Sequence, residues 1–334
     1  MTTSTLNQIA LPSFTKGRRT VTPTERPTKN KGIIDRWMVD GRRRFRELLR
    51  VINETVMVND AFGLRVDNVE AAGRGAFSRG QEQTRIDNFL RWLVRQEREG
   101  ILEIITPPGA RQGRPWSDVY VRQNFTRGAV VGNAQVLGLG VEVPRLGTNP
   151  DAVVNFLSQP HNVERLKIIQ TRTWTGMRGI TETMNAQIAN EIAQGFALGE
   201  SPRQMAYRIN DRVRKIGMSR ADLIARTEAN AAYNEGAIAE YDQAGGIVGE
   251  NIHTQWHATL DSRVRDSHLR RHGKIFKKED ALKLIGEPNC RCSLLPYVPS
   301  VEGKAKFSKA STFMGNVIHS DYWRAENARE YCCG

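Results

Sequence analysis

One apolar stripe constrains the fold of this chain more than any other feature. Between residues 162 and 198, apolar side chains and one threonine recur at every third or fourth position: Leu166, Ile169, Thr173, Met177, Ile180, Met184, Ile188, Ile192 and Phe196. This spacing matches the helical repeat and predicts a single long helix with one buried face. Gly176 and Gly179 lower the helix propensity of the segment. Packing against the rest of the chain or against a partner must therefore hold this helix.

Other segments with helical spacing stand on both sides of the stripe. Three lie upstream, at residues 36–58, 68–98 and 117–134. Downstream, Ser201 followed by Pro202 is typical of a helix start and predicts a short helix. Ser219, with Asp222 three residues later, resembles a capping pair. It predicts a further helix that runs to about residue 244 and stops at Gly245-Gly246.

The sequence pattern changes after residue 246, where apolar and polar residues begin to alternate. Strands are predicted at 251–260, 273–276 and 293–298, with short helices at 263–271 and 279–284. The fold class that follows is α+β and mainly α-helical. Long helices pack with a small C-terminal α+β module, after a disordered basic N-terminal arm.

Composition divides the chain into four predicted parts. Glycines and prolines gather between residues 138 and 150 and mark a domain boundary there. The first 32 residues are rich in Thr, Pro, Lys and Arg, and such a segment stays disordered until it binds a partner. The predicted parts are a basic arm (1–32), a helical N-terminal domain (33–150), a second domain (151–300) that contains the α+β module (247–298), and a polar, basic tail (301–334).

The net charge of +13 is concentrated near the N-terminus. Residues 1–50 hold 12 Lys and Arg against 4 Asp and Glu, a net charge of +8. A basic segment of this kind usually has an anionic partner, most often nucleic acid, although a solubilising tail has the same composition. The candidate phosphate-binding residues are Lys16, Arg18, Arg19, Arg42, Arg43 and Arg44.

The sequence also predicts the cellular location of the chain. No apolar run approaches the roughly 20 residues that a membrane span needs, and the first 31 residues lack the apolar core of a signal peptide. We therefore expect a soluble protein that is made in the cytoplasm.

Cysteine and histidine residues gather in the C-terminal module. His268 precedes the triplet Cys290-Arg291-Cys292 by about twenty residues. Zinc binds Cys and His ligands in tetrahedral geometry, so His268, Cys290 and Cys292 form a candidate zinc site. The fourth ligand would be His272 or Glu287, with His257 and Asp261 as further candidates. The other pair, Cys332-Cys333, has no assigned role.

Two blocks together resemble a known family. The first is Ile224-Ala-Arg226-Thr-Glu228-Ala-Asn230-Ala-Ala-Tyr233-Asn234, and the second is residues 256–296 with its Asp261-Ser-Arg263-Val-Arg265-Asp-Ser-His268 run and its Cys-Arg-Cys triplet. In this order they resemble the phage head morphogenesis family, the Mu F-like minor head proteins of tailed bacteriophages. The resemblance covers roughly residues 160–298 and identifies the second domain as Mu F-like.

The family motif falls on ten further residues of this chain. They are Arg226, Glu228, Asn230, Trp256, Asp261, Arg263, Arg265, Gly273, Arg291 and Pro296. The resemblance implies that polar residues of the first block lock their helix to the α+β module, with Trp256 on the apolar side of that junction. An exposed charged helix face would show the same pattern of residues.

The chain also departs from the pattern of many relatives. Those relatives look like they carry Cys-x-x-Cys where this chain has Arg265 and His268, and a histidine where it has Glu287. Other relatives resemble this chain and have Arg and His at the first pair. Three interpretations follow for the site. It binds zinc with an altered ligand set, or it is a packed motif in which Asp261 caps a helix or pairs with an arginine, or a Cys–His pair acts chemically. The sequence contains no P-loop and no H-E-x-x-H box, so we expect no enzymatic activity.

The resemblance implies a minor capsid protein of low copy number that aids head assembly and DNA packaging or delivery. Its expected location is the virion, at the capsid interior or portal vertex, after synthesis in the host bacterial cytoplasm. The implied partners are the portal protein, the major capsid or scaffold protein and phage DNA, without a small-molecule substrate. The alternative is a DNA-binding protein with a metal clip that acts in packaging or ejection.

Overall fold

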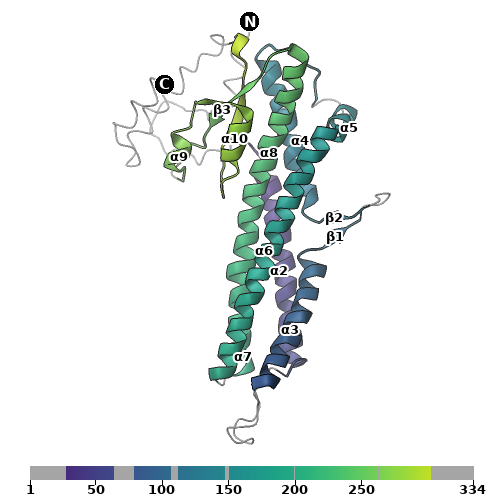
Figure 1. Ribbon diagram of the computed structural model, residues 1–334, viewed down its shortest axis with the longest axis vertical. Helices are drawn as coiled ribbons and strands as arrows, with labels where there is room; N and C mark the ends of the chain where they lie inside the picture. The colour runs from purple at the N-terminus through teal and green to yellow at the C-terminus, as the bar shows by residue number, and fades with distance from the viewer. Residues whose placement is uncertain are drawn as a thin grey trace, which may run out of the picture. The chain divides into compact units, whose positions relative to one another are not determined.

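The computed structural model describes residues 28–63, 79–106, 112–146, 150–198, 200–261 and 263–301 (Figure 1). Long helices dominate, and a small antiparallel sheet follows them, which confirms the predicted fold class. The described chain divides into two compact units, one built from 28–33, 121–169 and 227–301 and the other from 34–120 and 170–226. Segments from both sides of residue 150 thus contribute to each unit.

The unit of residues 34–120 and 170–226 begins with helix α2 (Lys31–Ile52), which continues as a π-helical turn (Asn53–Val58). Its apolar face buries Trp37, Phe45, Leu48 and Ile52. Helix α3 (Arg79–Gly100) follows, and a two-stranded ribbon comes next, β1 (Ile104–Ile105) with β2 (Arg114–Pro115). The ribbon was not expected from the sequence. Residues 68–78 of the predicted second helix lie outside the described residues.

The long helix is confirmed. Helix α6 spans Pro160–Leu198, and every stripe residue from Leu166 to Ile192 is buried. The stripe is therefore a core face. A preceding helix, α5 (Pro150–Ser158), begins at the last residue of the predicted loop-rich connection.

Helix α7 (Pro202–Arg212) starts as predicted, because Ser201 caps it and Gln204 completes a capping box. The helix predicted to start at Ser219 does start there, but the predicted capping role of Ser219 is wrong. A π-helical turn (Val213–Met218) leads straight into α8 (Ser219–Val248), and Ser219 itself is helical, with φ −67° and ψ −38°. Gly245 and Gly246 are also inside α8, which ends before Gly249 at φ +69°. Only this last glycine adopts the left-handed conformation that ends helices.

In the other unit, α4 (Asp118–Gly138) packs against α8 at very short range. A Cβ atom added to Gly128 would lie 1.8 Å from the carbonyl oxygen of Tyr233, and one added to Gly236 would lie 1.9 Å from that of Phe125. The two helices therefore approach through their glycines. Glu240 of α8 accepts a hydrogen bond from Asn133 of α4 at 2.7 Å.

The small module follows α8. Its sheet has the order β4-β3-β5, and both pairings are antiparallel. The strands are β3 (His253–His257), β4 (Ile275–Phe276) and β5 (Ser293–Tyr297), with helices α9 (Asp266–Leu269) and α10 (Lys278–Ile285) and a 3-10 turn at Pro299–Val301. Figure 1 shows the module beside the C-terminal part of α8. One core cluster joins the two, because Tyr241 and Ala237 of α8 belong to it with Trp256 and Leu294.

Several predictions fall on residues outside the described part. The basic arm to residue 27 and the tail from residue 302 belong to this group, with Lys16, Arg18 and Arg19 among them. Within the described residues, no helix combines the length and the apolar character that crossing a membrane requires.

Candidate functional site

Two segments of the module bring His268 and the Cys290–Cys292 triplet together. His268 lies on α9, and the triplet leads directly into β5. Before the triplet, Asn289 adopts a left-handed conformation with φ 58°, which asparagine tolerates better than most residues. Its backbone N–H donates to Thr227 Oγ1 of α8 at 3.0 Å. This turn is thus fixed to the helix beneath it.

His268, Cys290 and Cys292 form one buried cluster. Nδ1 of His268 lies 3.3 Å from Sγ of Cys292 and 3.6 Å from Sγ of Cys290. The three ligand atoms all lie within 4.8 Å of one another, and each residue is at most 3% exposed. The three residues predicted as metal ligands are therefore adjacent in space.

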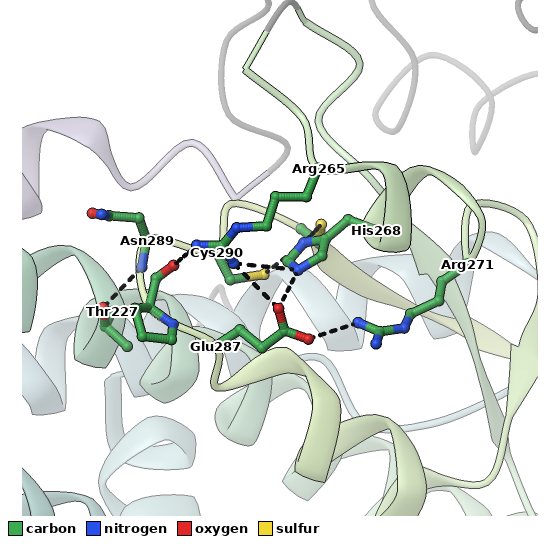
Figure 2. A network of polar contacts seen from close by, with 9 residues as sticks. Thr227, Arg265, His268, Arg271, Glu287, Asn289 and Cys290 are labelled. Carbon is green, nitrogen blue, oxygen red and sulfur yellow. Dashed lines mark hydrogen bonds and ion pairs between the residues drawn. The ribbon is translucent and has the colours of Figure 1, made fainter. Parts of the chain in front are cut away.

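The other ring nitrogen of His268 faces a carboxylate (Figure 2). Nε2 lies 2.8 Å from Oε2 of Glu287, and that carboxylate also accepts from Arg271 at 2.9 Å and from Arg265 at 3.2 Å. Arg265 and Glu287 thus contact each other directly. Glu287 therefore fixes the orientation of the imidazole and does not join the two sulfurs.

The charges of this network are strongly coupled. A hydrogen bond with Cys292 lowers the pKa of the Cys290 thiol to about 5, with help from His268 and against the effect of burial. Cys292, beside it, has a pKa well above its ordinary value. Burial lowers the pKa of His268, but hydrogen bonds to Cys290 and Glu287 outweigh it and raise the pKa overall. Burial also raises the pKa of Glu287, yet His268 and Arg271 bring it down to about 2.

The structure positions the predicted fourth ligands elsewhere. Glu287 contacts Nε2 of His268 and not the sulfurs. The ring of His272 packs beside His257, with centroids 5.5 Å apart. Asp261 is paired with Arg291, where one contact is 2.7 Å, as the packed-motif interpretation expected. Within the described part of the chain, no fourth His, Cys, Asp or Glu belongs to the cluster.

Two asparagines of α8 hold the segment that leads from Cys292 into β5. The amide nitrogens of Asn230 and Asn234 donate to the Cys292 carbonyl at 3.1 and 3.2 Å. The amide oxygen of Asn234 accepts the backbone N–H of Leu294 at 2.8 Å, and Tyr241 donates to the Leu294 carbonyl at 3.0 Å. These contacts lock α8 to the module, as the resemblance implied for Asn230.

The contacts between α8 and the segment that carries Cys290 and Cys292 lie inside one stretch of the chain that matches a known family. Residues 186–295 match the family described as "Phage Mu protein F like protein". The chain is also 29% identical over 231 residues to minor head protein GP7 of Bacillus phage SPP1. The aligned residues make up 63% of this chain and 68% of that protein. The chain carries a Mu F-like phage head morphogenesis segment. The predicted resemblance is thereby confirmed for residues 186–295.

Two other relatives match the chain that carries this Mu F-like segment. The NAD(+)–arginine ADP-ribosyltransferase EFV of Enterococcus faecalis is 22% identical over 261 residues, 74% of this chain but 51% of the enzyme. An uncharacterized protein of Haemophilus influenzae is 26% identical over 168 residues, 48% of this chain and 36% of that protein. The chain thus spans about half of the enzyme and about a third of the second protein. No solved structure gives a significant match.

Other residues of the Mu F-like motif support the module. Trp256 is fully buried, and its ring meets that of His268 edge to face at 5.8 Å, while Arg271 lies 5.2 Å from its ring centroid. Gly273 has φ +80°, and its N–H donates to the Trp256 carbonyl at 2.8 Å. Pro296 of β5 stands opposite Thr254 of β3. Trp256 therefore contacts His268 directly, while Gly273 and Pro296 contact β3.

The remaining motif residues are outside the sulfur cluster. Asp261 does not cap α9, because Arg265 precedes that helix; the Asp261 carboxylate accepts instead from the backbone N–H of Arg263 at 3.0 Å. Arg226 lies 3.7 Å from Asp222 of its own helix. Glu228 is buried on α8.

The arginines predicted to bind phosphate have partners within their own unit. Arg42 pairs with Asp222, Arg43 with Asp40 at 3.1 Å, and Arg44 with Glu103 at 2.6 Å. Arg44 also lies 4.5 Å from the centroid of the Trp116 ring. These contacts give Arg42 and Arg44 a role in holding α2 within its unit.

Some residues of the Mu F-like site were missed at the sequence level. Asn234 could have been found, because it stands four residues after Asn230 and shares its helix face. Tyr241 and Thr227 carried no such signal, since their partners are backbone atoms more than fifty residues away. The orienting role of Glu287 also depends on a contact that spacing does not reveal.

Proposed function

We propose that this chain is a minor head protein of a tailed bacteriophage, a low-copy virion component that acts in head morphogenesis by binding and positioning. One observation carries the proposal. The Mu F-like match at 186–295 contains the lock between α8 and the small module, and the similarity to a minor head protein covers 231 residues, well beyond that segment. The shared feature is thus a folded scaffold.

The expected partners are the portal protein, the major capsid or scaffold protein and the packaged DNA. The site of action is the capsid interior or the portal vertex, after synthesis in the host cytoplasm. The net charge of +13 supports contact with DNA, because phosphate groups attract such a chain without sequence preference.

A second candidate is a DNA-binding protein that acts in packaging or ejection and carries a metal clip. The convergence of His268, Cys290 and Cys292 favours it. In this case, too, the chain would act by binding.

Enzymatic activity is not part of the proposal. The similarity to an ADP-ribosyltransferase covers half of that enzyme, at 22% identity. We expect the purified chain, incubated with NAD(+) and an arginine-containing protein, to transfer no ADP-ribose. Transfer above the rate of a heat-inactivated sample would contradict the proposal.

The proposal is tested in the phage that encodes the chain. Deletion of its gene should lower the yield of infectious particles or of filled heads, and a plasmid copy should restore the yield. A plasmid copy with Arg226→Ala serves as a control, because that arginine makes only a 3.7 Å contact on its own helix. Normal heads with normal infectivity after deletion would refute the head role.

A further inference from the structure

We propose that His268, Cys290 and Cys292 bind one zinc ion through Nδ1 and two thiolates, with Glu287 as the carboxylate that orients the imidazole. The fourth coordination position is left to a water molecule. The proposal depends on the geometry of the buried cluster and is independent of the head role.

The distances between the ligand atoms fit a shared ion. Zinc–sulfur bonds of about 2.3 Å and zinc–nitrogen bonds of about 2.0–2.1 Å in tetrahedral geometry separate nitrogen from sulfur by about 3.6 Å. The two separations in the cluster are 3.3 and 3.6 Å. Both sulfurs also converge on the same nitrogen. A single N–H donates well to one acceptor, whereas an ion between the three atoms satisfies all of them at once.

The second nitrogen of the imidazole identifies the role of Glu287. Nε2 lies 2.8 Å from Oε2 of Glu287, so with zinc bound it would donate to that carboxylate and leave the lone pair of Nδ1 for the ion. Metal-binding histidines commonly donate their other N–H to a carboxylate in this way. Arg271 and Arg265 hold that carboxylate at 2.9 and 3.2 Å.

The frame around the cluster holds the ligands in position. Asn230 and Asn234 fix the carbonyl of Cys292, and Thr227 fixes the turn before Cys290. Because α8 supplies all three contacts, the cysteines are oriented before any ion binds.

Charge and ligand type select the metal. Two thiolates and a neutral imidazole balance the charge of one divalent ion, which suits a buried position. Thiolates favour soft or borderline metals over calcium and magnesium, and a tetrahedral set of sulfur and nitrogen is typical of zinc.

The first test measures metal on the full chain. After purification under reducing conditions without added metal, elemental analysis should find about one zinc per chain. After removal of zinc with a chelator, cobalt(II) should bind and give the thiolate charge-transfer band and the visible bands of a tetrahedral site. Absence of zinc together with no cobalt band would overturn the proposal.

Variants assign the ligands. Cys290→Ser and Cys292→Ser should each lose the bound zinc. The double variant Cys332→Ser, Cys333→Ser removes the only other thiols of the chain and should still hold about one zinc. Loss of zinc in this control would overturn the ligand set. Should the single cysteine variants fail to fold, the cobalt spectrum of the wild-type chain still decides, since a site without thiolates shows no charge-transfer band.

Glu287→Gln tests the orienting role separately. We expect it to retain one zinc per chain and an unchanged tetrahedral cobalt spectrum, with an affinity lower by about 10- to 100-fold. An unchanged affinity would refute the role of Glu287, and a changed cobalt spectrum would make it a ligand. Because these readouts use the isolated chain, their failure leaves the head role untouched.

Discussion

At the residue scale, two side-chain amides determine how the small module is attached to α8. Asn230 and Asn234 are fully buried, and both donate to the carbonyl of Cys292. Asn234 also receives the N–H of Leu294. A short strand whose backbone groups are satisfied by side chains cannot slide without losing those hydrogen bonds. The amides therefore fix the register of β5 against the helix.

Asn234→Ala should lower the free energy of unfolding by about 3 kcal/mol, because it leaves the buried N–H of Leu294 without its acceptor and removes a donor from Cys292. Urea unfolding measures this change. Arg226→Ala is the matched control on the same helix and should cost less than about 1 kcal/mol, since its ion pair is partly exposed. Equal losses in the two variants would contradict this account.

A buried carboxyl group makes stability depend on pH. Burial raises the pKa of Glu97 to about 8, against the hydrogen bond from Asn185 at 2.7 Å. The folded chain thus keeps a proton that the unfolded chain releases above its ordinary pKa of 4.5. The contribution of Glu97 to the free energy of unfolding is fully present below pH 4.5 and is lost as the pH rises through about 8.

Glu97→Gln should remove this dependence, because the amide mimics the neutral acid. Each pKa unit corresponds to about 1.4 kcal/mol, so at pH 8 the variant should exceed the wild-type chain by a few kcal/mol. At pH 4.5 the two should be similar. Thermal unfolding across this range compares them, and parallel curves for the two proteins would show that Glu97 is ionised in the fold.

At the element scale, glycines set the distance between α4 and α8. A methyl group at Gly128 or Gly236 would collide with a backbone carbonyl of the facing helix. Backbone atoms cannot rotate away as side chains do, so the helices would have to separate. Glycine lowers helix propensity, and this close packing compensates for it.

Gly236→Ala should therefore destabilise the chain by about 3 kcal/mol or more. Gly246→Ala, on the same helix, has no atom within 4 Å of the new methyl group and should gain about 0.5–1 kcal/mol from helix propensity. Chemical unfolding of both variants provides the comparison. A stable Gly236→Ala protein would mean that α4 and α8 are not in close contact.

Helices whose position depends on a local sequence pattern could be predicted from the sequence. The stripe from Leu166 to Ile192 was enough for α6, because a helical repeat is a local pattern. Ser201 and Pro202 revealed the start of α7 in the same way. The cap predicted at Ser219 failed, since a π-helical turn leads into α8 at this point and Ser219 itself is helical. Gly245 and Gly246 failed as a stop because both are helical, and the glycine with positive φ that follows the helix is Gly249.

The candidate site was predictable in its residue types but not in its geometry. Thiol and imidazole groups at 268, 290 and 292 suggested one cluster, and the structure forms it. The pairing of Arg265 with Glu287, and of Glu287 with Nε2 of His268, depends on a turn at Asn289. Such a turn is set by contacts with α8 that are distant in sequence.

At the scale of the whole molecule, positive charge is unevenly distributed. The chain carries +13, and the first fifty residues contribute 12 basic against 4 acidic residues. Arg42, Arg43 and Arg44 pair with carboxylates in the fold. We therefore expect the phosphate contacts upstream of these arginines, at Lys16, Arg18 and Arg19.

Substitution of Lys16, Arg18 and Arg19 by Ala should flatten the salt dependence of DNA binding. Each lost phosphate contact changes the slope of log K against log salt by about 0.9, so the slope should fall by up to about 3. Substitution of Arg42, Arg43 and Arg44 by Ala is the comparison. It should lower the free energy of unfolding but change the slope of log K against log salt little. Fluorescence anisotropy at several salt concentrations measures both slopes. An unchanged slope in the first variant would exclude the arm as a DNA contact.

The central claim is that this chain is a low-copy structural component of a phage head. Quantitative mass spectrometry of purified full heads tests it most directly, with the copies of this chain compared against those of the portal and major capsid proteins. The account predicts a few copies per particle that stay with the filled head. Absence of the chain from purified heads would contradict it.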